Sequence, residues 1–570
     1  MTTIHKHHCR PSKANSLCRL LGVGCWVFST LSSQLSFLTA CQQSEWDDHY
    51  APQTEVSGTL LDVMTADGRF SRFLEAVNKA GKTSLLTGTQ TYTVWAPTDN
   101  VLQTAEVSSA LNVSNHISRF IYGIEDLVDT TALRIKMLSG KYVDFTHDAR
   151  SSSSYSIGDA LLKESSLLAS NGVVHSIGDI IPLRQNLYEK IQDDPRFSQL
   201  AAYLTAFDER EFDGSKSISI GQNDYGQTVY DSVFNYSNYW MKHHGSIYDE
   251  DSTYTMLLPT NQAWTEGEGL VKPCFRTFGK MLTDDSNSGR SLIATRTYAL
   301  DTDEADSLQR VHTQQAMAGS LVFRRVVNPV ENDSLITTTG QVIHTPQSMF
   351  DNASPEPTSN GMAMVTDNWT VPATDTWNRT LRIEAETAIH KQLYTTTPTT
   401  RDATTEGFVG VVSGNAWLEV ENASTSARMQ PQILFDLPGT LATTYNIYVV
   451  MAPGLAHDAT HQGDSTRVRF YLNYVHEDGT MHEDDVIEAD PLTGMPFVTN
   501  GRAMTRFLIA HHFRFPYANV NMSEDEELPT TSQEPAVKLR MQTNVAASET
   551  TLMNKVMRID CFILEPVTAE

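Results

Sequence analysis

The stretch Tyr92–Asn100 reads Tyr-Thr-Val-Trp-Ala-Pro-Thr-Asp-Asn, and the rest of the chain can be ordered around it. Its β-branched and aromatic residues predict a buried strand that ends at Pro97, because proline has no N–H to donate to a strand ladder. Thr98 or Asp99 is then placed to cap a following turn or helix. The same phrase returns as Tyr-Thr-Met-Leu-Leu-Pro-Thr-Asn-Gln at Tyr254–Gln262, which indicates an internal repeat.

The repeat extends to both sides of this phrase. Upstream, Leu60–Ser71 matches Leu187–Ser198, and downstream, Asn171–Asp179 matches Asn360–Asn368. The three anchors recur in the same order, but their spacing grows in the second copy. The second copy therefore carries insertions.

This pattern resembles the fasciclin domain family, which has a helical start, a Thr-Val-Phe-Ala-Pro-Thr-Asn/Asp strand and a closing Asn-Gly-Val-Val-His-x-Ile-Asp segment. Residues 56–186 match both segments, with Trp95 in place of the usual phenylalanine, and residues 187–380 match more weakly. The Tyr-His motif that some members use for partner contacts has no clear match, and the nearest stretch is Phe120–Gly123. The resemblance implies two fasciclin-like domains and an adhesion-type role without naming a receptor.

The periodicity of apolar residues changes in residues 381–570. Short alternating segments replace the helical periodicity, as in Arg467–Tyr474, where every second residue is apolar. Turn dipeptides such as Pro438-Gly439 and Asp478-Gly479 separate several of these segments. We therefore expect an α+β chain, with two fasciclin-like domains followed by an all-β jelly-roll sandwich.

The two ends of this third region resemble the galactose-binding-like sandwiches of carbohydrate-binding modules. It opens with Arg-Ile-Glu-Ala-Glu and closes with Met-Arg-Ile-Asp-Cys-Phe-Ile-Leu. The resemblance implies a structural Ca²⁺ held by Glu384, Glu386 and Asp560, with backbone carbonyls supplying the remaining oxygen ligands. The alternative is that these acids face solvent.

A glycan site in this sandwich would use exposed aromatic rings, because sugar faces stack on flat rings. Trp417 and Tyr471 are the candidates, with a core position as the alternative for Trp417. A second candidate contact surface is the polar insertion at residues 208–251, which is rich in aromatic residues. Its alternative is an excursion that packs its aromatic residues onto its own domain.

Residues 1–40 are predicted to be a secretory signal, with a basic start and an apolar run at Leu20–Leu38. Thr39, Ala40 and Cys41 follow this run, and small residues before a single cysteine resemble the bacterial lipoprotein signal. Lipidation of Cys41 would anchor the chain in a membrane. An uncleaved anchor and an ordinary signal are the alternatives. Residues 41–55 form a tether, whose acidic cluster resembles the surface-export signal of Bacteroidetes lipoproteins or is a solvated spacer.

Charge and motifs limit the functional classes. The chain has 42 Lys+Arg against 68 Asp+Glu, a balance that repels phosphate backbones and argues against nucleic acid as a partner. No nucleophile, phosphate-loop or metalloprotease motif is present. The adjacent pairs His243-His244 and His511-His512 are expected to point to opposite strand faces and share no metal. The sequence thus predicts a protein that is not an enzyme.

The leading hypothesis is a non-catalytic lipoprotein on the cell-surface side of the outer membrane. It would bind extracellular polysaccharide beside an outer-membrane nutrient transporter. The alternative is a protein-binding adhesin, or a structural subunit that docks on the transporter through the fasciclin-like domains. Exposed aromatics on the 208–251 insertion would favour a protein partner, and a groove on the sandwich would favour glycan. An enzyme would instead need a cleft with converging carboxylates.

Overall fold

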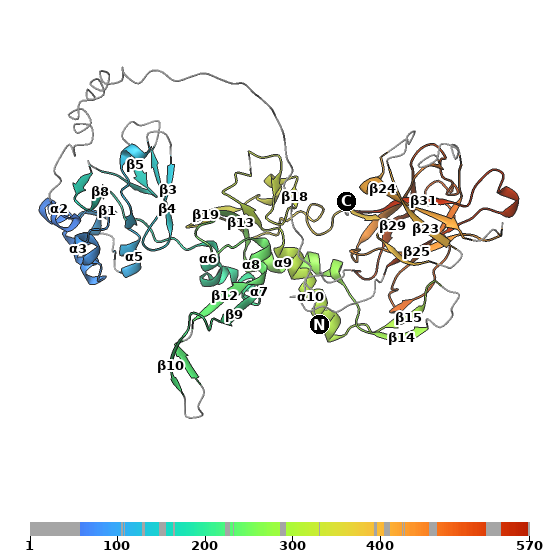
Figure 1. The fold of residues 1–570 in the computed structure, drawn as a ribbon, viewed down its shortest axis with the longest axis horizontal. Coiled ribbons are helices and arrows are strands. Elements are labelled where there is room, and N and C mark those ends of the chain that lie inside the picture. The colour runs from blue at the N-terminus through green and yellow to red at the C-terminus, as the bar shows by residue number, and fades with distance from the viewer. Residues whose placement is uncertain are drawn as a thin grey trace, which may run out of the picture.

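A computed structural model describes residues 58–567, except for segments within 104–108, 128–131, 148–154, 164–165, 223–227, 232, 286–291, 330, 393–395, 404–410, 424–427, 455–463 and 520–536. We call residues 58–182 the first repeat, residues 186–371 the second repeat and residues 381–567 the C-terminal unit. They follow one another along the long axis of the molecule (Figure 1). Among the helices of the described ranges, none is long and apolar enough to cross a membrane.

The elements are as follows. The first repeat has α2 (Leu60–Asp67), α3 (Ser71–Lys79), α4 (Thr83–Thr87), β1 (Tyr92–Pro97), α5 (Ala110–Ser114), β2 (Ile117–Arg119), β3 (Ala132–Lys136), β4 (Tyr142–His147), β5 (Tyr155–Ile157), β6 (Ala160–Leu161), β7 (Leu167–Ala169) and β8 (Gly172–Ile177). The second repeat has α6 (Leu187–Asp193), α7 (Ser198–Thr205), β9 (Asp208–Phe212), β10 (Ile218–Gln222), β11 (Thr228–Asp231), β12 (Phe234–Asn238), α8 (Tyr239–His244), β13 (Tyr254–Pro259), α9 (Asn261–Val271), β14 (Met281–Asp285), β15 (Thr295–Tyr298), α10 (Asp303–Ala318), β16 (Val322–Arg324), β17 (Leu335–Ile336), β18 (Val342–Ile343), α11 (Pro346–Met349), β19 (Ser354–Thr358) and β20 (Gly361–Thr366). The C-terminal unit has β21 (Leu381–Glu384), β22 (Ile389–Gln392), β23 (Thr396–Asp402), β24 (Ala416–Asn422), β25 (Gln432–Asp436), β26 (Thr444–Met451), β27 (Val468–Asn473), β28 (Thr480–Met481), β29 (Thr505–Arg514), β30 (Lys538–Thr543) and β31 (Met557–Pro566).

The repeated phrases of the sequence pair with each other in the structure. Strand β1 runs parallel to β8, with Tyr92 opposite Gly172, and β13 runs parallel to β20, with Tyr254 opposite Gly361. Each pair lies at the centre of a four-stranded sheet, in the orders β2-β1-β8-β7 and β16-β13-β20-β19. All six residues of β1 are buried, as are all six of β13. The two copies are therefore built on one plan.

A buried asparagine ties the first helix of each repeat to its sheet. Asn171 Oδ1 accepts from the Leu60 N–H at 2.8 Å, and Asn360 Oδ1 accepts from the Leu187 N–H at 2.9 Å. In each copy the Nδ2 group donates to two backbone carbonyls of the segment that comes just before the central strand β1 or β13. Buried polar groups need such partners, so the asparagine fixes where the helix begins relative to the strands. This explains why the asparagine recurs in the closing segment.

The polar residue after each central strand caps a helix that lies earlier in the chain. Asp99 Oδ1 accepts from the Arg72 N–H at 2.8 Å, at the start of α3, and Asn261 Oδ1 accepts from the Gln199 N–H at 3.0 Å, at the start of α7. Of the two residues expected to cap a following turn or helix, Asp99 instead caps the earlier helix α3, and the alternative, Thr98, stays a prediction. Phe70, the residue before α3, has no side-chain cap of its own, so the sheet supplies one from a distance.

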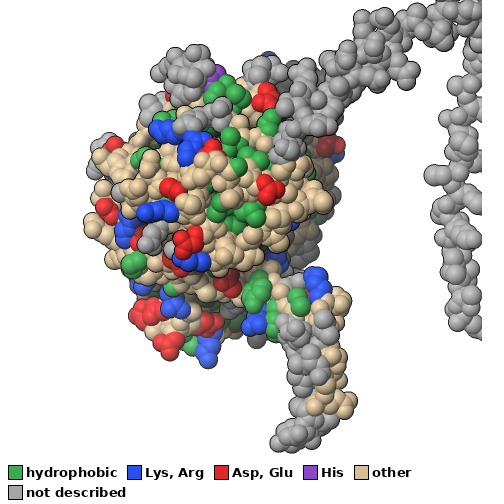
Figure 2. Space-filling model, turned by 90° about the vertical axis from the view of Figure 1, so that its left-hand side faces the viewer, with side chains coloured by type: hydrophobic (Ala, Val, Ile, Leu, Met, Phe, Trp, Pro, Cys, Tyr) green, Lys and Arg blue, Asp and Glu red, His purple; other side chains and the backbone are tan. Residues whose placement is uncertain are grey.

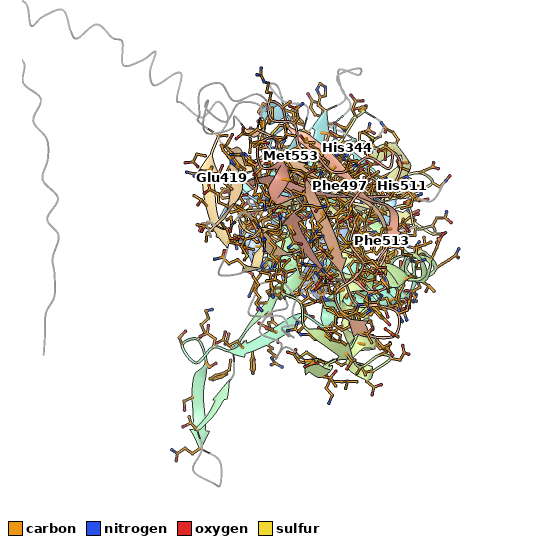
Figure 3. All side chains as sticks on the ribbon, turned by 90° about the vertical axis from the view of Figure 1, so that its right-hand side faces the viewer. His344, Glu419, Phe497, His511, Phe513 and Met553 are labelled. Carbon is orange, nitrogen blue, oxygen red and sulfur yellow. The ribbon has the colours of Figure 1, made fainter. Side chains whose placement is uncertain are left out.

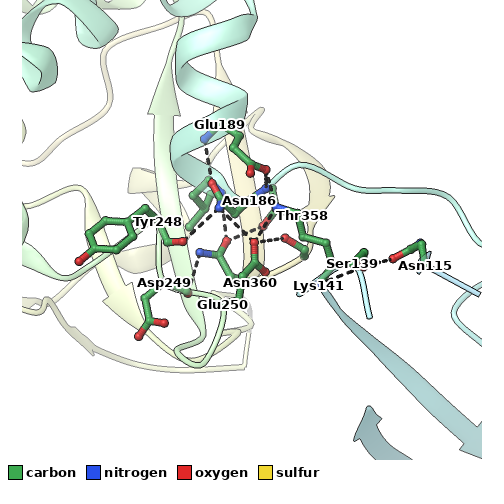
Figure 4. Close-up of polar contacts among 12 residues, drawn as sticks. Asn115, Ser139, Lys141, Asn186, Glu189, Tyr248, Asp249, Glu250, Thr358 and Asn360 are labelled. Atoms are coloured by element: carbon green, nitrogen blue, oxygen red, sulfur yellow. Dashed lines mark hydrogen bonds and ion pairs between the residues drawn. The ribbon is translucent and has the colours of Figure 1, made fainter. Parts of the chain in front are cut away.

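The hairpin β3–β4 of the first repeat docks on the second repeat (Figure 4). At its turn, Lys141 Nζ lies 2.5 Å from Glu189 Oε2 and 2.6 Å from Glu250 Oε1. Glu250 Oε1 also accepts from Asn186 Nδ2 at 3.0 Å, and Asn186 is the N-cap of α6. Arg134 of β3 donates to the Glu250 carbonyl at 3.1 Å. A polar, largely buried junction therefore joins the two repeats.

Two antiparallel sheets make up the C-terminal unit. One contains β23-β24-β31-β26-β29 with β21 beside β31, and the other has the order β22-β25-β30-β27. Both sheets contribute to one apolar core, for example through Phe435 and Phe562, whose ring centroids are 4.8 Å apart. A fully buried Glu419 (labelled in Figure 3) lies between Arg401 and Arg558, at 2.9 Å and 2.8 Å. The jelly-roll class of this pair of sheets stays a prediction.

The second repeat touches the C-terminal unit through its β14–β15 excursion. Strand β15 pairs antiparallel with β28, with Arg296 opposite Met481. Nearby, Arg276 Nη1 lies 2.7 Å from Glu477 Oε2. This contact joins the last two parts of the chain.

Candidate functional site

The aromatic residues predicted as sugar platforms do not form one surface. Trp417 is fully buried and packs with Val412 and Ala452, which corrects its assignment as a platform because its ring has no face in contact with solvent. Tyr471 is half-buried, and the Arg540 guanidinium carbon lies 3.5 Å from its ring centroid. One face of the Tyr471 ring is thus already covered by Arg540. A sugar contact at Tyr471 stays a prediction.

The three acids predicted to bind calcium come together around the turn at residues 413–415 of the C-terminal unit. Ser413 donates to two of them, from its N–H to Asp560 Oδ1 at 2.9 Å and from Oγ to Glu384 Oε1 at 2.5 Å. A Cβ on the adjacent Gly414, whose φ is +58°, would lie 3.7 Å from Glu386 Oε1 and 3.9 Å from Glu384 Oε2. The turn at 413–415 thus brings its backbone close to all three carboxylates.

These carboxylates fit a hard cation. Glu384 Oε2 and Glu386 Oε2 are buried oxygens with no hydrogen-bond partner. Burial, together with the charge of Glu384, raises the pKa of Asp560 to about 7. A bound Ca²⁺ would supply the missing partner and favour the ionised acids. The thiol of Cys561 also adjoins the group, and burial raises its pKa to about 12, so it stays protonated. Calcium binding by Glu384, Glu386 and Asp560 stays a prediction.

Two other sequence predictions concern the lipidation of Cys41 with its tether and the adjacent histidine pairs. Cys41 and the tether lie outside the described residues. The expectation that His511 and His512 point to opposite strand faces is wrong, because their rings stack at a centroid distance of 3.9 Å (His511 is labelled in Figure 3). His512 has φ +50°, and this irregular backbone turns both rings to the same side. His243 and His244 lie on helix α8 and not on a strand, which corrects the same expectation for that pair. That neither pair shares a metal stays a prediction.

The most exposed aromatic feature of the described chain is the ribbon formed by β9 and β12 in the 208–251 insertion. We call it the aromatic ribbon. Its register places Phe234 opposite Phe212 and Tyr236 opposite Arg210. Side chains two apart on a strand share a face, so these four lie on one face of the ribbon. Glu209 and Glu211 alternate with them and lie on the other face. The ribbon projects from the body in two perpendicular views (Figures 1 and 2).

Contacts among the four side chains hold this face in order. The Arg210 guanidinium carbon lies 3.6 Å from the Phe234 ring centroid and 5.6 Å from that of Tyr236. Phe212 meets Phe234 edge-on at 5.9 Å. Tyr236 is 70% exposed and Phe212 is 43% exposed. Large aromatic side chains at such exposure are typical of contact surfaces.

A hollow of about 410 Å³ lies at the base of the aromatic ribbon. Tyr188, Tyr236, Tyr248 and Met241 form its apolar lining. The Tyr188 hydroxyl donates to Asp208 Oδ2 at 2.9 Å. Burial, and to a smaller extent this contact, raises the pKa of Tyr188 to about 12. The phenol therefore stays neutral at every physiological pH. A hollow of this size accepts one large side chain or a ring.

One part of the 208–251 insertion packs onto its own domain, and another part is exposed, so the two alternatives apply to different segments. Trp240 is 2% exposed and packs in the core of the second repeat, so part of the insertion folds onto its own domain. The aromatic ribbon instead faces solvent. In the described part of the chain, β9 and β12 pair only with each other, so each leaves one outer edge with unpaired backbone groups. Such an edge can accept an added strand.

Comparison with known proteins identifies one part of the chain. Residues 68–182 match the family model of the fasciclin domain. The chain contains a fasciclin domain. Transforming growth factor-beta-induced protein ig-h3 from Sus scrofa is 28% identical over 163 residues, and its counterpart from Oryctolagus cuniculus is 28% identical over 162 residues. Each match covers 27% of this chain and 23% of the relative, so the chain spans less than a quarter of these relatives.

A solved fasciclin domain pair from the insect cell adhesion molecule fasciclin I is also similar, with 10% identity and a TM-score of 0.22 over 54% of this chain and 99% of that chain. Fasciclin domains are associated with adhesion or protein binding and are generally non-enzymatic. Residues of the two sequence motifs of this fasciclin domain pack in its interior. His175 is 1% exposed, stacks on Trp95 at 4.6 Å and lies 2.7 Å from the Tyr122 carbonyl oxygen.

Proposed function

We propose that this protein is a non-catalytic adhesion protein that binds a partner protein through the aromatic ribbon of the second repeat. The observation that carries the proposal is the exposed face of Phe212, Phe234 and Tyr236, ordered by Arg210 beside unpaired strand edges. The fasciclin domain supports an adhesive role. The partner would add an extended segment to a ribbon edge and place an aromatic or apolar side chain in the hollow at its base.

The charge of the aromatic ribbon indicates which kind of partner segment would bind to it. Glu209 and Glu211 lie on the face opposite the aromatic side chains, and the whole chain is acidic. A partner segment with apolar residues alternating with lysine or arginine would therefore match both faces. Polysaccharide capture at the same hollow is the competing function, because Tyr188, Tyr236 and Tyr248 offer ring faces to a sugar.

The proposal includes a location. The lipoprotein-like signal supports an anchor at Cys41 in the outer membrane, with the tether of residues 41–55 holding the folded parts on the cell-surface side, beside a nutrient transporter. Mass spectrometry of the mature N terminus tests the anchor. A lipid on Cys41 supports it, and an unmodified Cys41 overturns it.

Binding of the soluble chain from residue 42 to surfaces of the producing cells tests the binding function. We expect binding that is lost after protease treatment of the cells and kept after periodate oxidation of their glycans. The double variant Phe212→Ser, Tyr236→Ser should reduce it at least tenfold. Leu552→Ser is the control, because Leu552 is 80% exposed on the C-terminal unit.

Two outcomes would contradict the proposal. Loss of binding after periodate but not after protease would assign the surface to polysaccharide capture. Binding of equal strength by wild type and the double variant would move the contact away from the aromatic ribbon.

A further inference from the structure

A turn of the C-terminal unit, residues 474–484, brings two histidines and an aspartate together. The turn is fixed by its backbone: the His476 N–H donates to the Thr480 carbonyl at 2.8 Å, and the Gly479 N–H donates to the His476 carbonyl at 2.9 Å. Gly479 has φ +79°, and a Cβ there would lie 2.7 Å from the Tyr298 carbonyl oxygen. The turn therefore holds its shape against the second repeat.

The side chains that flank this turn converge on one carboxylate. Asp484 Oδ1 lies 2.8 Å from His476 Nε2 and 3.4 Å from His482 Nδ1. The two imidazole rings lie 4.5 Å apart, with 16° between their planes. One nitrogen from each histidine and one oxygen of Asp484 all lie within 4.8 Å of one another. Ligands bonded to one ion at about 2.0–2.2 Å lie at comparable separations.

The aspartate is positioned as a metal ligand would be. Its N–H donates to Oδ1 of Asn473, a fully buried residue, at 3.1 Å. Its Oδ2 is buried and has no hydrogen-bond partner. Burial raises the pKa of Asp484, although His476 and His482 oppose this effect. A cation at this position would offset the cost of burying the charge.

The donor set selects the class of ion. Two imidazole nitrogens and one carboxylate suit zinc and neighbouring transition metals, whereas Ca²⁺ and Mg²⁺ prefer oxygen alone. We propose that His476, His482 and Asp484 bind a divalent transition metal of the zinc class. The three ligands leave a fourth position for water. His482 is 46% exposed on its side chain, so the ion can enter from solvent and the ring can adjust to it.

The site lies at a junction within the chain. Strand β28, between the two histidines, pairs with β15 of the second repeat, with Thr480 opposite Thr297. A metal that ties His476 to His482 would hold β28 in place and so strengthen the contact between the second repeat and the C-terminal unit. Metal binding is thereby linked to the order of this junction.

Calorimetric titration of Zn²⁺ into the soluble chain from residue 42, freed of metal by a chelator, tests the proposal. We expect one zinc-binding event that an excess of Mg²⁺ does not displace. His482→Ala and Asp484→Asn should each weaken it at least about tenfold. Affinity should fall as the solution is made more acidic, because protons compete with the metal for the imidazole nitrogens. Zinc should also slow hydrogen exchange at Thr480 and Met481.

His344→Ala is the matched control. His344 Nδ1 lies 2.9 Å from Asp375 Oδ1, an exposed histidine–aspartate pair without a second imidazole, so its loss should leave zinc binding unchanged. Absence of zinc binding would overturn the proposal. Equal affinity in wild type, His482→Ala and Asp484→Asn would also overturn it. Equal weakening by all three variants would assign the binding to scattered surface histidines.

Discussion

Removing the Lys141 side chain should loosen the junction between the two repeats. Its side chain is 11% exposed and contacts Glu189 and Glu250, whose side chains are 44% and 17% exposed. Breaking a buried ion pair by removing one partner costs about 3–5 kcal/mol, because the other charge is left without compensation. Water screens Glu189, so we expect a value near the lower end, about 3 kcal/mol for Lys141→Ala.

Hydrogen exchange of the Lys190 amide measures this cost. That amide donates to the Asn186 carbonyl at 2.9 Å in the first turn of α6, next to the junction. A loss of about 3 kcal/mol speeds exchange about 100-fold, since every 1.4 kcal/mol is a factor of ten. The double variant Lys141→Met, Glu250→Gln should recover most of the loss, because it removes both charges of the more buried pair and leaves only Glu189, which water screens.

Lys79→Ala is the control for this measurement. Lys79 and Glu75 form a pair on the surface of α3, with side chains 74% and 63% exposed. Such a pair contributes at most about 0.5 kcal/mol, so its loss should leave the Lys190 amide unchanged. An exchange rate within a factor of three of wild type in Lys141→Ala would refute the reasoning, because the lysine would then compensate no buried charge.

Two further predictions concern pH and calcium. Burial lowers the pKa of His116 to about 4, so the folded first repeat should lose up to about 3 kcal/mol as pH falls from 6.5 to 4, because the unfolded chain binds the proton more tightly. Exchange of the Trp95 amide, which donates to the His116 carbonyl at 2.8 Å, should speed up over this range, and less so in His116→Gln; a flat profile would contradict the prediction. Calcium at 100 times its dissociation constant should stabilise the C-terminal unit by about 2.7 kcal/mol, seen as a higher melting temperature that Glu384→Gln abolishes. Equal melting temperatures in calcium and in chelator would show that the carboxylates bind no ion.

Much of the fold could be predicted from local sequence patterns, because short stretches of residues specify these strands and turns. The strand ending at Pro97 and the closing Asn171–Ile177 segment were each recognisable from their own residues, and each recurs in the second copy. A local residue type also fits the turn between β3 and β4, where Gly140 has φ +90°, which glycine adopts without strain. The aromatic content of the insertion was visible as well, though the sequence left its packing open.

Positions that depend on distant partners were beyond such patterns. Trp417 and Tyr236 are both large aromatic residues in alternating segments, yet one is fully buried and the other is 70% exposed. The difference arises because Trp417 packs with residues 412 and 452, whereas Tyr236 lies on a ribbon whose two strands, within the described residues, pair only with each other. No local rule separates the two environments.

The sequence by itself determined the repeat and the fasciclin domain, because each is encoded in short motifs. Its resemblance to galactose-binding-like sandwiches indicated Glu384, Glu386 and Asp560 as candidate calcium ligands. Only the tertiary structure decided that Asp99 caps an earlier helix and that Lys141 joins the two repeats. It also decided that the side chains of His476, His482 and Asp484 converge. These groups meet through backbone turns and strand pairing between separate segments, and spacing along the chain does not contain that geometry.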